Sequence, residues 1–251
     1  HERVIICPES FDIKWGDESL FLNTLYLLDY AFNQEIDFDF FSLHSGQDLA
    51  TRPISEFVEF LEADPQRSFI EYNRLPYRRW RYRGGLGRVQ LKWPRAFIRR
   101  VPKYSVIWWL RALYVGLYEL GIIKGKKLPE IDFYGGSAWF TMSRDAVSWV
   151  FQYLNNNPWF LKMFEGAFMA DEIVIQTILM NSPLRDRIIN DNLRYIDWSS
   201  GPEFPRTLRC SDLSEMHKPR TFFARKFSQF VDQEVIGSII ENTREGAAGR
   251  E

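Results

Sequence analysis

The first part of the chain alternates short β-branched or aromatic runs with stretches of helical periodicity. Residues 3–7 are typical of a buried strand, and residues 19–32 have apolar residues at the spacing of one helix face. Aromatic residues over 37–43 predict a second strand; after a loop, residues 54–61 predict a helix and 69–72 a further strand. Strands that alternate with helices in this way are typical of α/β proteins, so we expect an α/β fold.

The rest of the chain continues with the same kinds of element. Residues 145–155 predict a helix that Ser143 caps, residues 188–198 contain a strand, and residues 231–242 form the last helix. The chain has 251 residues, of which 45% are hydrophobic and 26% charged, so we expect a single globular domain over residues 1–251. Its two cysteines do not suggest a disulfide framework, which favours a reducing compartment.

Two adjacent carboxylates, Asp171 and Glu172, precede a strongly apolar run. Apolar side chains at 173–175 and 178–180 predict a buried helix with Asp171 as its N-cap, and Asn181-Ser182-Pro183 predicts its end. The helix dipole and free N–H groups at such a position favour an ionised carboxylate, which can act as a general base. The alternative is structural: Asp171 caps the helix and Glu172 is a solvated acid of its first turn.

A basic and aromatic segment occupies the middle of the chain, within an insertion at about residues 72–125. Residues 72–118 contain no Asp or Glu, and their Lys and Arg residues alternate with Tyr, Trp and Phe. This pattern fits an anionic membrane surface, single-stranded nucleic acid, or the mouth of a sugar-phosphate site. It also fits a solvated loop followed by an amphipathic helix. Because Arg111 and Glu119 interrupt the apolar run at 104–123, we expect an interfacial or core helix there and not a membrane span.

The sequence offers each of the groups that sugar transfer from a nucleotide donor needs. Glu172 is the candidate base for the acceptor hydroxyl, and an aromatic side chain would stack on the acceptor sugar. Lysines and arginines can neutralise the leaving diphosphate in place of a metal ion. The candidate cations are Arg206, Arg209, Arg225 and Lys226, and the candidate aromatic platforms are Trp139, Tyr195 and Trp198.

A metal role has little support in the sequence. Asp37-Phe38-Asp39 has the form of an Asp-x-Asp metal-binding motif, but these aspartates open a predicted strand instead of closing one. His44 and His217 have no neighbour at metal-ligand spacing. We therefore expect no metal and no other cofactor.

Several short motifs occur in the order found in one glycosyltransferase family. They are Lys14-Trp15-Gly16, residues 40–48 (FFSLHSGQD), residues 134–140 (YGGSAWF), Asp171-Glu172, residues 193–198 (LRYIDW) and residues 222–227 (FFARKF). In these motifs the chain resembles the core-2/I-branching enzyme family, which includes branching N-acetylglucosaminyltransferases and peptide O-xylosyltransferases. The resemblance implies a GT-A-like nucleotide-sugar-binding fold, with a mixed sheet flanked by helices.

The resemblance also implies a mechanism and a set of site residues. The expected reaction is an inverting, metal-independent transfer of N-acetylglucosamine or xylose from a UDP-sugar to a glycan hydroxyl. Glu172 would be the general base, and Lys226 with Arg206 would contact the UDP diphosphate, Arg209 being the second choice for that arginine. The family's donor contacts fall on Ser45, Gly46 and Asp48, and its acceptor contacts on Tyr195 and Trp198. We also expect Trp139 and Asp171 to contact the acceptor.

Two departures from the family pattern accompany the resemblance. The family's first nucleotide-binding strand and helix have no counterpart in the sequence, and the several cysteines of its animal Golgi members are missing. The second departure favours a bacterial-type enzyme in the cytoplasm, peripheral on the inner face of the membrane, with a free or lipid-linked glycan as acceptor and no nucleic acid partner. The competing hypothesis is a binding module that uses residues 72–118 on a membrane or a nucleic acid.

Overall fold

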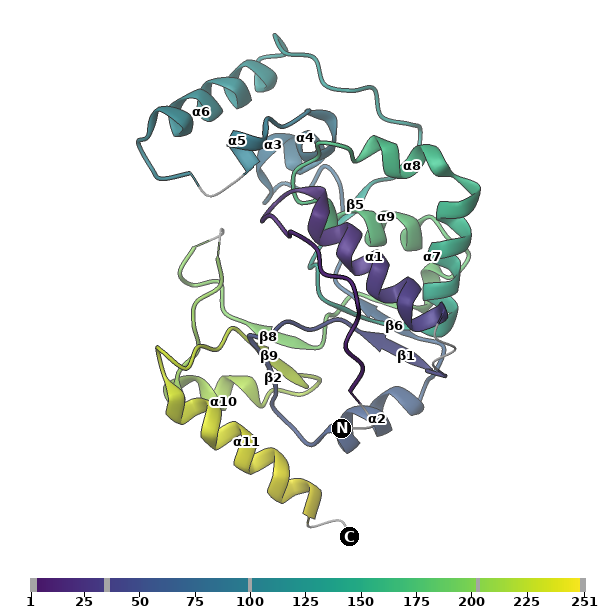
Figure 1. The fold of residues 1–251 in the computed structure, drawn as a ribbon, viewed down its shortest axis with the longest axis vertical. Helices are drawn as coiled ribbons and strands as arrows, with labels where there is room; N and C mark the ends of the chain where they lie inside the picture. Colours follow the sequence, from purple (N-terminus) through teal and green to yellow (C-terminus); the bar gives the residue numbers. More distant parts are fainter. Residues whose placement is uncertain (1–3, 34–36, 99–100, 202–203, 249–251) are drawn as a thin grey trace.

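The main sheet is mixed, as the sequence predicts. The computed structural model describes residues 4–33, 37–98, 101–201 and 204–248 (Figure 1). The order of the strands is β1 (Phe40–Ser42), β6 (Phe140–Ser143), β3 (Ser68–Ile70) and β7 (Ile188–Ile189). Strand β6 is antiparallel to both of its neighbours, whereas β3 and β7 are parallel. The predicted α/β class is confirmed.

A second sheet carries the C-terminal motifs. It consists of β2 (Asp48–Ala50), β9 (Phe223–Arg225) and β8 (Arg194–Ile196), with β9 in the middle. Strand β9 is antiparallel to β2 and parallel to β8, and the register places Asp48 opposite Arg225. Residues from three separate motifs therefore lie side by side. A short third sheet pairs β4 (Asn73–Arg74) with β5 (Tyr134–Gly135).

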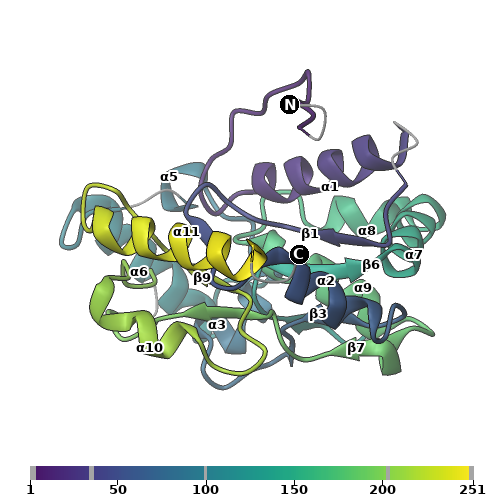
Figure 2. The same cartoon turned by 90° about the horizontal axis from the view of Figure 1, so that it is seen from below.

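The helices form three groups around these sheets. Near β1 and β6 are α1 (Glu18–Asn33), α7 (Arg144–Asn156), α8 (Pro158–Met163) and α9 (Val174–Met180) (Figure 1). Near the second sheet are α2 (Ile54–Glu62), α10 (Leu213–Met216) and α11 (Gln233–Ala248). The basic segment supplies α3 (Arg81–Gly84), α4 (Leu86–Gln90), α5 (Arg95–Ile98) and α6 (Val106–Glu119). Figure 2 shows α5 and α6 on the side of the molecule away from α7.

The apolar run after Glu172 forms the centre of the core. Every residue of α9 from Val174 to Met180 is buried, and the helix packs against α7 and β5. Helix α7 begins as predicted, because the Ser143 hydroxyl accepts a hydrogen bond from the Ala146 N–H at 3.4 Å. The helices expected over 19–32, 54–61 and 145–155 are confirmed as α1, α2 and α7.

The strand expected over residues 3–7 is wrong for its described part. Residues 4–7 form no strand, and Val4, Ile5 and Ile6 are exposed. A β-branched run becomes a strand only where a neighbouring strand satisfies its backbone hydrogen bonds, and within the described residues none pairs with it. The other boundaries differ by less: residues 188–198 hold two short strands, β7 and β8, and the last helix is α11.

Asp171 is not the N-cap of the buried helix. Residues Ala170–Glu172 form a 3-10 turn, and Ile173, with φ −130°, separates this turn from α9. The two carboxylates therefore lie in this 3-10 turn, and one non-helical residue separates the turn from α9. The segment 104–123 contains α6, as expected, and within the described residues no helix is long and apolar enough to cross a bilayer.

Candidate active site

Two glycines fix the backbone of the Glu172 turn. The Gly136 N–H donates to the Glu172 carbonyl oxygen at 2.9 Å. A Cβ atom on Gly136 would lie 1.8 Å from the Glu71 carbonyl oxygen, and one on Gly135 would lie 2.6 Å from the Trp80 ring. Only glycine allows the three backbones to meet this closely. The motif at residues 134–140 therefore positions the backbone of Glu172.

The carboxylate of Glu172 is paired with Arg88. Its Oε2 atom lies 2.5 Å from Nη1 of Arg88, and the two side chains are only 21% and 12% exposed. The Arg88 guanidinium also lies 3.9 Å from the centre of the Trp80 ring, while its buried Nε has no hydrogen-bond partner within the described residues. Glu172 is therefore an oriented, half-buried carboxylate, and the alternative of a solvated first-turn acid is wrong.

Asp171 and Glu71 add further carboxyl groups beside Glu172. Burial and then the charge of Glu172 raise the pKa of Asp171 to about 7 from an ordinary value of 3.8. Burial raises the pKa of Glu71 as well, with smaller contributions from Glu172 and Asp191. The Glu71 carboxylate accepts a hydrogen bond from Asn192 at 3.0 Å. The site therefore combines one paired carboxylate with two neighbouring carboxyl groups whose pKa values are raised.

The loop expected to bind the donor is ordered by its own side chains. The Ser45 hydroxyl and N–H donate to the two carboxylate oxygens of Asp48 at 2.9 and 3.1 Å. Asp48 also pairs with Nε of Arg225 at 3.1 Å, and its side chain is only 1% exposed. No atom lies within 4 Å of the place where a Cβ on Gly46 would stand. The loop is rigid on its inner side and open at Gly46.

A small cavity connects this loop with the acidic turn. It has a volume of about 150 Å³. Its lining comes from α1, residues 43–45, residues 138–140, Asp171 and Ile175. Arg225 closes one side of this region, because its guanidinium lies 4.1 Å from the centre of the Trp139 ring. Four predicted residues, Ser45, Asp48, Trp139 and Asp171, are thus brought together, with Glu172 next to Asp171 in the chain.

The predicted cations lie in different surroundings. Arg206 binds Asp197 and Asp212 at 2.5 and 2.7 Å, and hydrogen bonds to these carboxylates raise its pKa. Arg209 is exposed. Lys226 directly follows Arg225, is half-buried, and makes no ion pair within the described residues. The charge of Lys226 is therefore available to an anionic ligand, whereas that of Arg206 is already neutralised.

The two aromatic candidates on the second sheet are separate from the cavity. Tyr195 lies in β8 and packs against Leu208, Ala224 and their neighbours. Trp198 follows β8 and is 52% exposed. Neither residue lines the cavity that contains Asp171 and Trp139.

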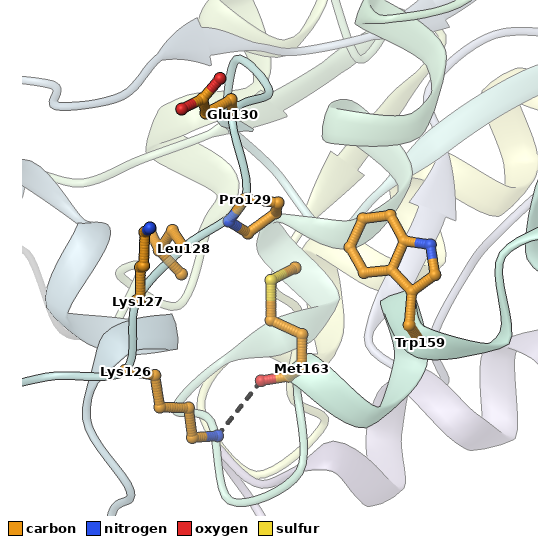
Figure 3. A pocket seen from close by; sticks show the side chains of 7 residues that line it. All are labelled: Lys126, Lys127, Leu128, Pro129, Glu130, Trp159 and Met163. Carbon is orange, nitrogen blue, oxygen red and sulfur yellow. Dashed lines mark hydrogen bonds between the residues drawn. The ribbon is translucent and has the colours of Figure 1, made fainter.

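A larger cavity lies elsewhere on the protein. Its volume is about 480 Å³, and its lining runs from Lys126 to Glu130 and includes Trp159 and Met163 (Figure 3). The ammonium group of Lys126 donates to the carbonyl oxygens of Met163 and Glu165 at 3.2 and 2.8 Å. The lining of this larger cavity includes none of the residues expected to bind donor or acceptor. Volume alone therefore does not identify the site.

The Asp-x-Asp sequence shows no sign of a metal site. Asp37 pairs with Arg144 at 2.9 Å. Over the described ranges, no three His, Cys, Asp or Glu side chains are grouped so as to hold a metal ion.

Sequence analysis missed Arg88 and Glu71. Arg88 is one of several arginines in the basic segment, and it lies 84 positions before its partner Glu172. The one available signal is its place among Gly84, Gly85 and Gly87, which permit close packing of the chain around Trp80 and Tyr82.

Comparison with known proteins identifies the family of the chain. The sequence matches the family model for the Core-2/I-Branching enzyme over residues 1–220. It is 25% identical to human (Homo sapiens) xylosyltransferase 1 over 258 residues, covering 95% of this chain and 24% of that protein. It is 26% identical to mouse (Mus musculus) xylosyltransferase 2 over 259 residues, covering 94% of this chain and 27% of that protein. The chain spans about a quarter of the length of the curated relatives it matches.

These matches and the fold define the class of enzyme as a glycosyltransferase. Its mixed sheets and flanking helices are those of a GT-A-like fold. The chain belongs to the core-2/I-branching enzyme family, since the family model covers most of its length.

Proposed function

We propose that the protein transfers a sugar from a UDP-sugar to a hydroxyl of a glycan acceptor, with inversion at the sugar carbon and without a metal ion. N-acetylglucosamine and xylose are the favoured sugars, the latter because the relatives are named xylosyltransferases. The observation that carries the proposal is the arrangement of Glu172. Arg88 holds its Oε2, while its Oε1 makes no hydrogen bond within the described residues.

Glu172 acts as the general base of this reaction. Its free oxygen accepts the proton of the acceptor hydroxyl as the hydroxyl oxygen attacks the sugar carbon. The bond from that carbon to the UDP oxygen breaks, and the electron pair leaves with the diphosphate. Arg88 is a positioning residue, because the ion pair and the Trp80 ring fix the direction in which the carboxylate points.

Positive charge at Arg225 and Lys226 is proposed to take the place of a metal ion at the leaving group. Lys226 is proposed as the main contact of the diphosphate, because its ammonium group has no ion-pair partner within the described residues. Arg225 lies in β9 beside Trp139, and its positive charge supports a diphosphate site at this strand. Arg206 remains a candidate only if it leaves Asp197 or Asp212. The open edge at Gly46 offers room for the donor nucleotide beside Ser45 and Asp48.

The acceptor is proposed to lie against Trp139 and Asp171. An indole ring stacks on the apolar face of a sugar. At neutral pH the Asp171 carboxyl is partly protonated, so it can donate or accept a hydrogen bond. Tyr195 and Trp198 would contact a more distant part of the glycan, because they lie outside the cavity.

The test is turnover of Glu172→Gln with UDP-N-acetylglucosamine and UDP-xylose as donors, each with and without a chelator. Glutamine keeps the shape of the side chain but cannot take the proton, so we expect turnover to fall about 10²–10⁴-fold. Thermal stabilisation by the preferred UDP-sugar should persist. The exposed Glu165→Gln is the matched control and should behave as the parent.

Near-parental turnover by a folded Glu172→Gln protein would overturn the assignment of the base. Loss of the parent's turnover in the chelator would overturn the metal-independent mechanism.

A further inference from the structure

Helix α6 exposes a continuous apolar stripe. We use the name α6 stripe for Tyr104, Val106, Trp109, Leu110, Leu113, Leu120 and Ile122, all of which are exposed. Val106 is three and four residues from Trp109 and Leu110, and Leu113 is four and three residues from the same pair, so all four lie on one face of the helix. Figure 1 shows α6 at the edge of the molecule, away from the sheets. A contiguous apolar patch that is exposed to solvent marks a site of interaction.

The other face of α6 is firmly attached to the protein. Tyr118 is 1% exposed, and its ring lies 4.3 Å from the Arg83 guanidinium. Arg111 donates to the Tyr82 hydroxyl at 2.7 Å, and its guanidinium lies 5.2 Å from the centre of the Phe168 ring. These contacts fix the rotation of α6, so the stripe cannot turn inward to be covered by the core.

The charge around the α6 stripe is positive. Lys103 directly precedes the stripe and Lys124 follows it, and Arg95 lies on the adjoining helix α5. Lys103 and Arg95 are exposed and make no ion pair within the described residues. The acid nearest in sequence is Glu119. It accepts a hydrogen bond from the backbone N–H of Arg83 at 2.9 Å and pairs with the Arg83 guanidinium at 3.8 Å. The stripe is therefore apolar in the middle and cationic at its ends.

This combination selects one occupant. A second copy of the same face would bring two cationic rims together, which opposes self-association. Nucleic acid would find few stacking platforms, because most of the stripe is aliphatic. An anionic bilayer matches both parts: aliphatic side chains enter the acyl boundary, Trp and Tyr lie at the headgroup level, and lysines contact the headgroups.

We propose that the α6 stripe docks the protein on the surface of an anionic lipid bilayer. The helix lies in the plane of the interface and does not cross it, since its 14 residues are too few for a span. This inference stands apart from sugar transfer, because no residue of the stripe belongs to the proposed active site. Failure of either one leaves the other intact.

The experiment is flotation of the whole chain with vesicles of phosphatidylcholine alone or mixed with phosphatidylglycerol, without any sugar substrate. The parent should bind the anionic vesicles at least tenfold more strongly than the neutral ones, and salt should weaken this binding. Leu110→Glu with Leu113→Glu should abolish it. Leu22→Glu, at an exposed apolar position of α1, is the matched control and should bind as the parent does.

A second measurement uses the unaltered protein. Anionic vesicles should slow amide hydrogen exchange in residues 104–122 and leave α11 unchanged. Equal binding by the double variant and the parent would overturn the proposal. So would absence of binding by the parent, or a stable dimer in solution that the double variant dissociates.

Discussion

Two parts of the basic, aromatic segment are both rich in aromatic residues but have opposite surroundings. In the inner part, residues 74–93, aromatic rings and guanidinium groups pack on one another: Trp93 is 3% exposed, and Arg88 lies between Trp80 and Glu172. In the outer part, residues 104–122, Trp109 is 59% exposed. The difference teaches that a high density of aromatic residues does not by itself determine burial.

The glycines of the inner part explain this difference. A Cβ on Gly87 would lie 2.8 Å from the Tyr118 ring, and one on Gly85 would lie 2.6 Å from the Trp80 ring. These close approaches let the inner part fold tightly against the residues that hold Glu172. In the outer part, no atom lies within 4 Å of the place where a Cβ on Gly116 would stand, so the chain makes no comparable close approach there.

The sharpest test replaces one tryptophan in each part. Trp93→Ala should lower the free energy of unfolding by about 3–5 kcal/mol, because it leaves a cavity in the core. It also removes the indole N–H that donates to the Gly87 carbonyl oxygen at 3.1 Å. Trp109→Ala should change the same quantity by less than about 0.5 kcal/mol, as exposed substitutions do. Denaturant unfolding measures both, and equal effects would remove the distinction between the two parts.

The second test compares a cation of the inner part with an exposed cation of the neighbouring helix α5. Arg88→Met should lower the free energy of unfolding by about 1.5–3 kcal/mol, the usual worth of a charged hydrogen bond. Turnover should fall up to about 10²-fold, because Glu172 loses its orientation while donor affinity is kept. Arg95→Met, on the exposed side of α5, should leave both quantities unchanged. An Arg88→Met protein with parental turnover would show that the pair is only structural.

The smallest effect concerns the carboxyl group next to the Arg88–Glu172 pair. The folded protein keeps the Asp171 proton up to about pH 7, whereas the unfolded chain loses it near 3.8. Protonated Asp171 therefore contributes stability below pH 4, and this contribution is lost as the pH rises to 7. Asp171→Asn, neutral at every pH, should be more stable than the parent above pH 7. The full pKa shift corresponds to roughly 4 kcal/mol, and solvent access to the half-buried carboxyl reduces the expected difference to about 1–2 kcal/mol.

Unfolding at pH 4 and pH 8 measures this difference, with the exposed Asp186→Asn as control. At pH 4 the Asp171→Asn and parent proteins should be equally stable. A difference between them that does not change with pH would contradict the raised pKa of Asp171.

Local patterns predicted much of the fold. The periodicity of residues 19–32 and 54–61 predicted α1 and α2, and Ser143 caps α7 through a contact three residues away. The strand predicted at residues 4–7 was wrong because a strand depends on a neighbouring strand that local sequence does not specify. The prediction of Asp171 as N-cap was wrong because the non-helical residue Ile173 lies between it and the start of α9.

Several residues of the candidate site were predictable from the sequence, but their contacts were not. The family motifs pointed to Ser45, Asp48, Trp139 and Asp171, which gather around one cavity or next to it. The partner of Glu172 was not predictable, because an ion pair across 84 positions leaves no periodic signal. The ion pairs of Arg206 with Asp197 and Asp212 were likewise not predictable from the sequence.

Gly136 has a practical consequence for anyone who wishes to retarget such an enzyme. Its missing side chain lets the backbones of Glu71 and Glu172 come together, so any larger residue would displace both acids at once. Under the proposed function, libraries that seek new acceptors should leave this crossing untouched and vary exposed positions such as Trp198. Gly136→Ala then becomes an inactivating variant that removes no ionisable side chain, because its methyl group would displace the backbone that positions Glu172.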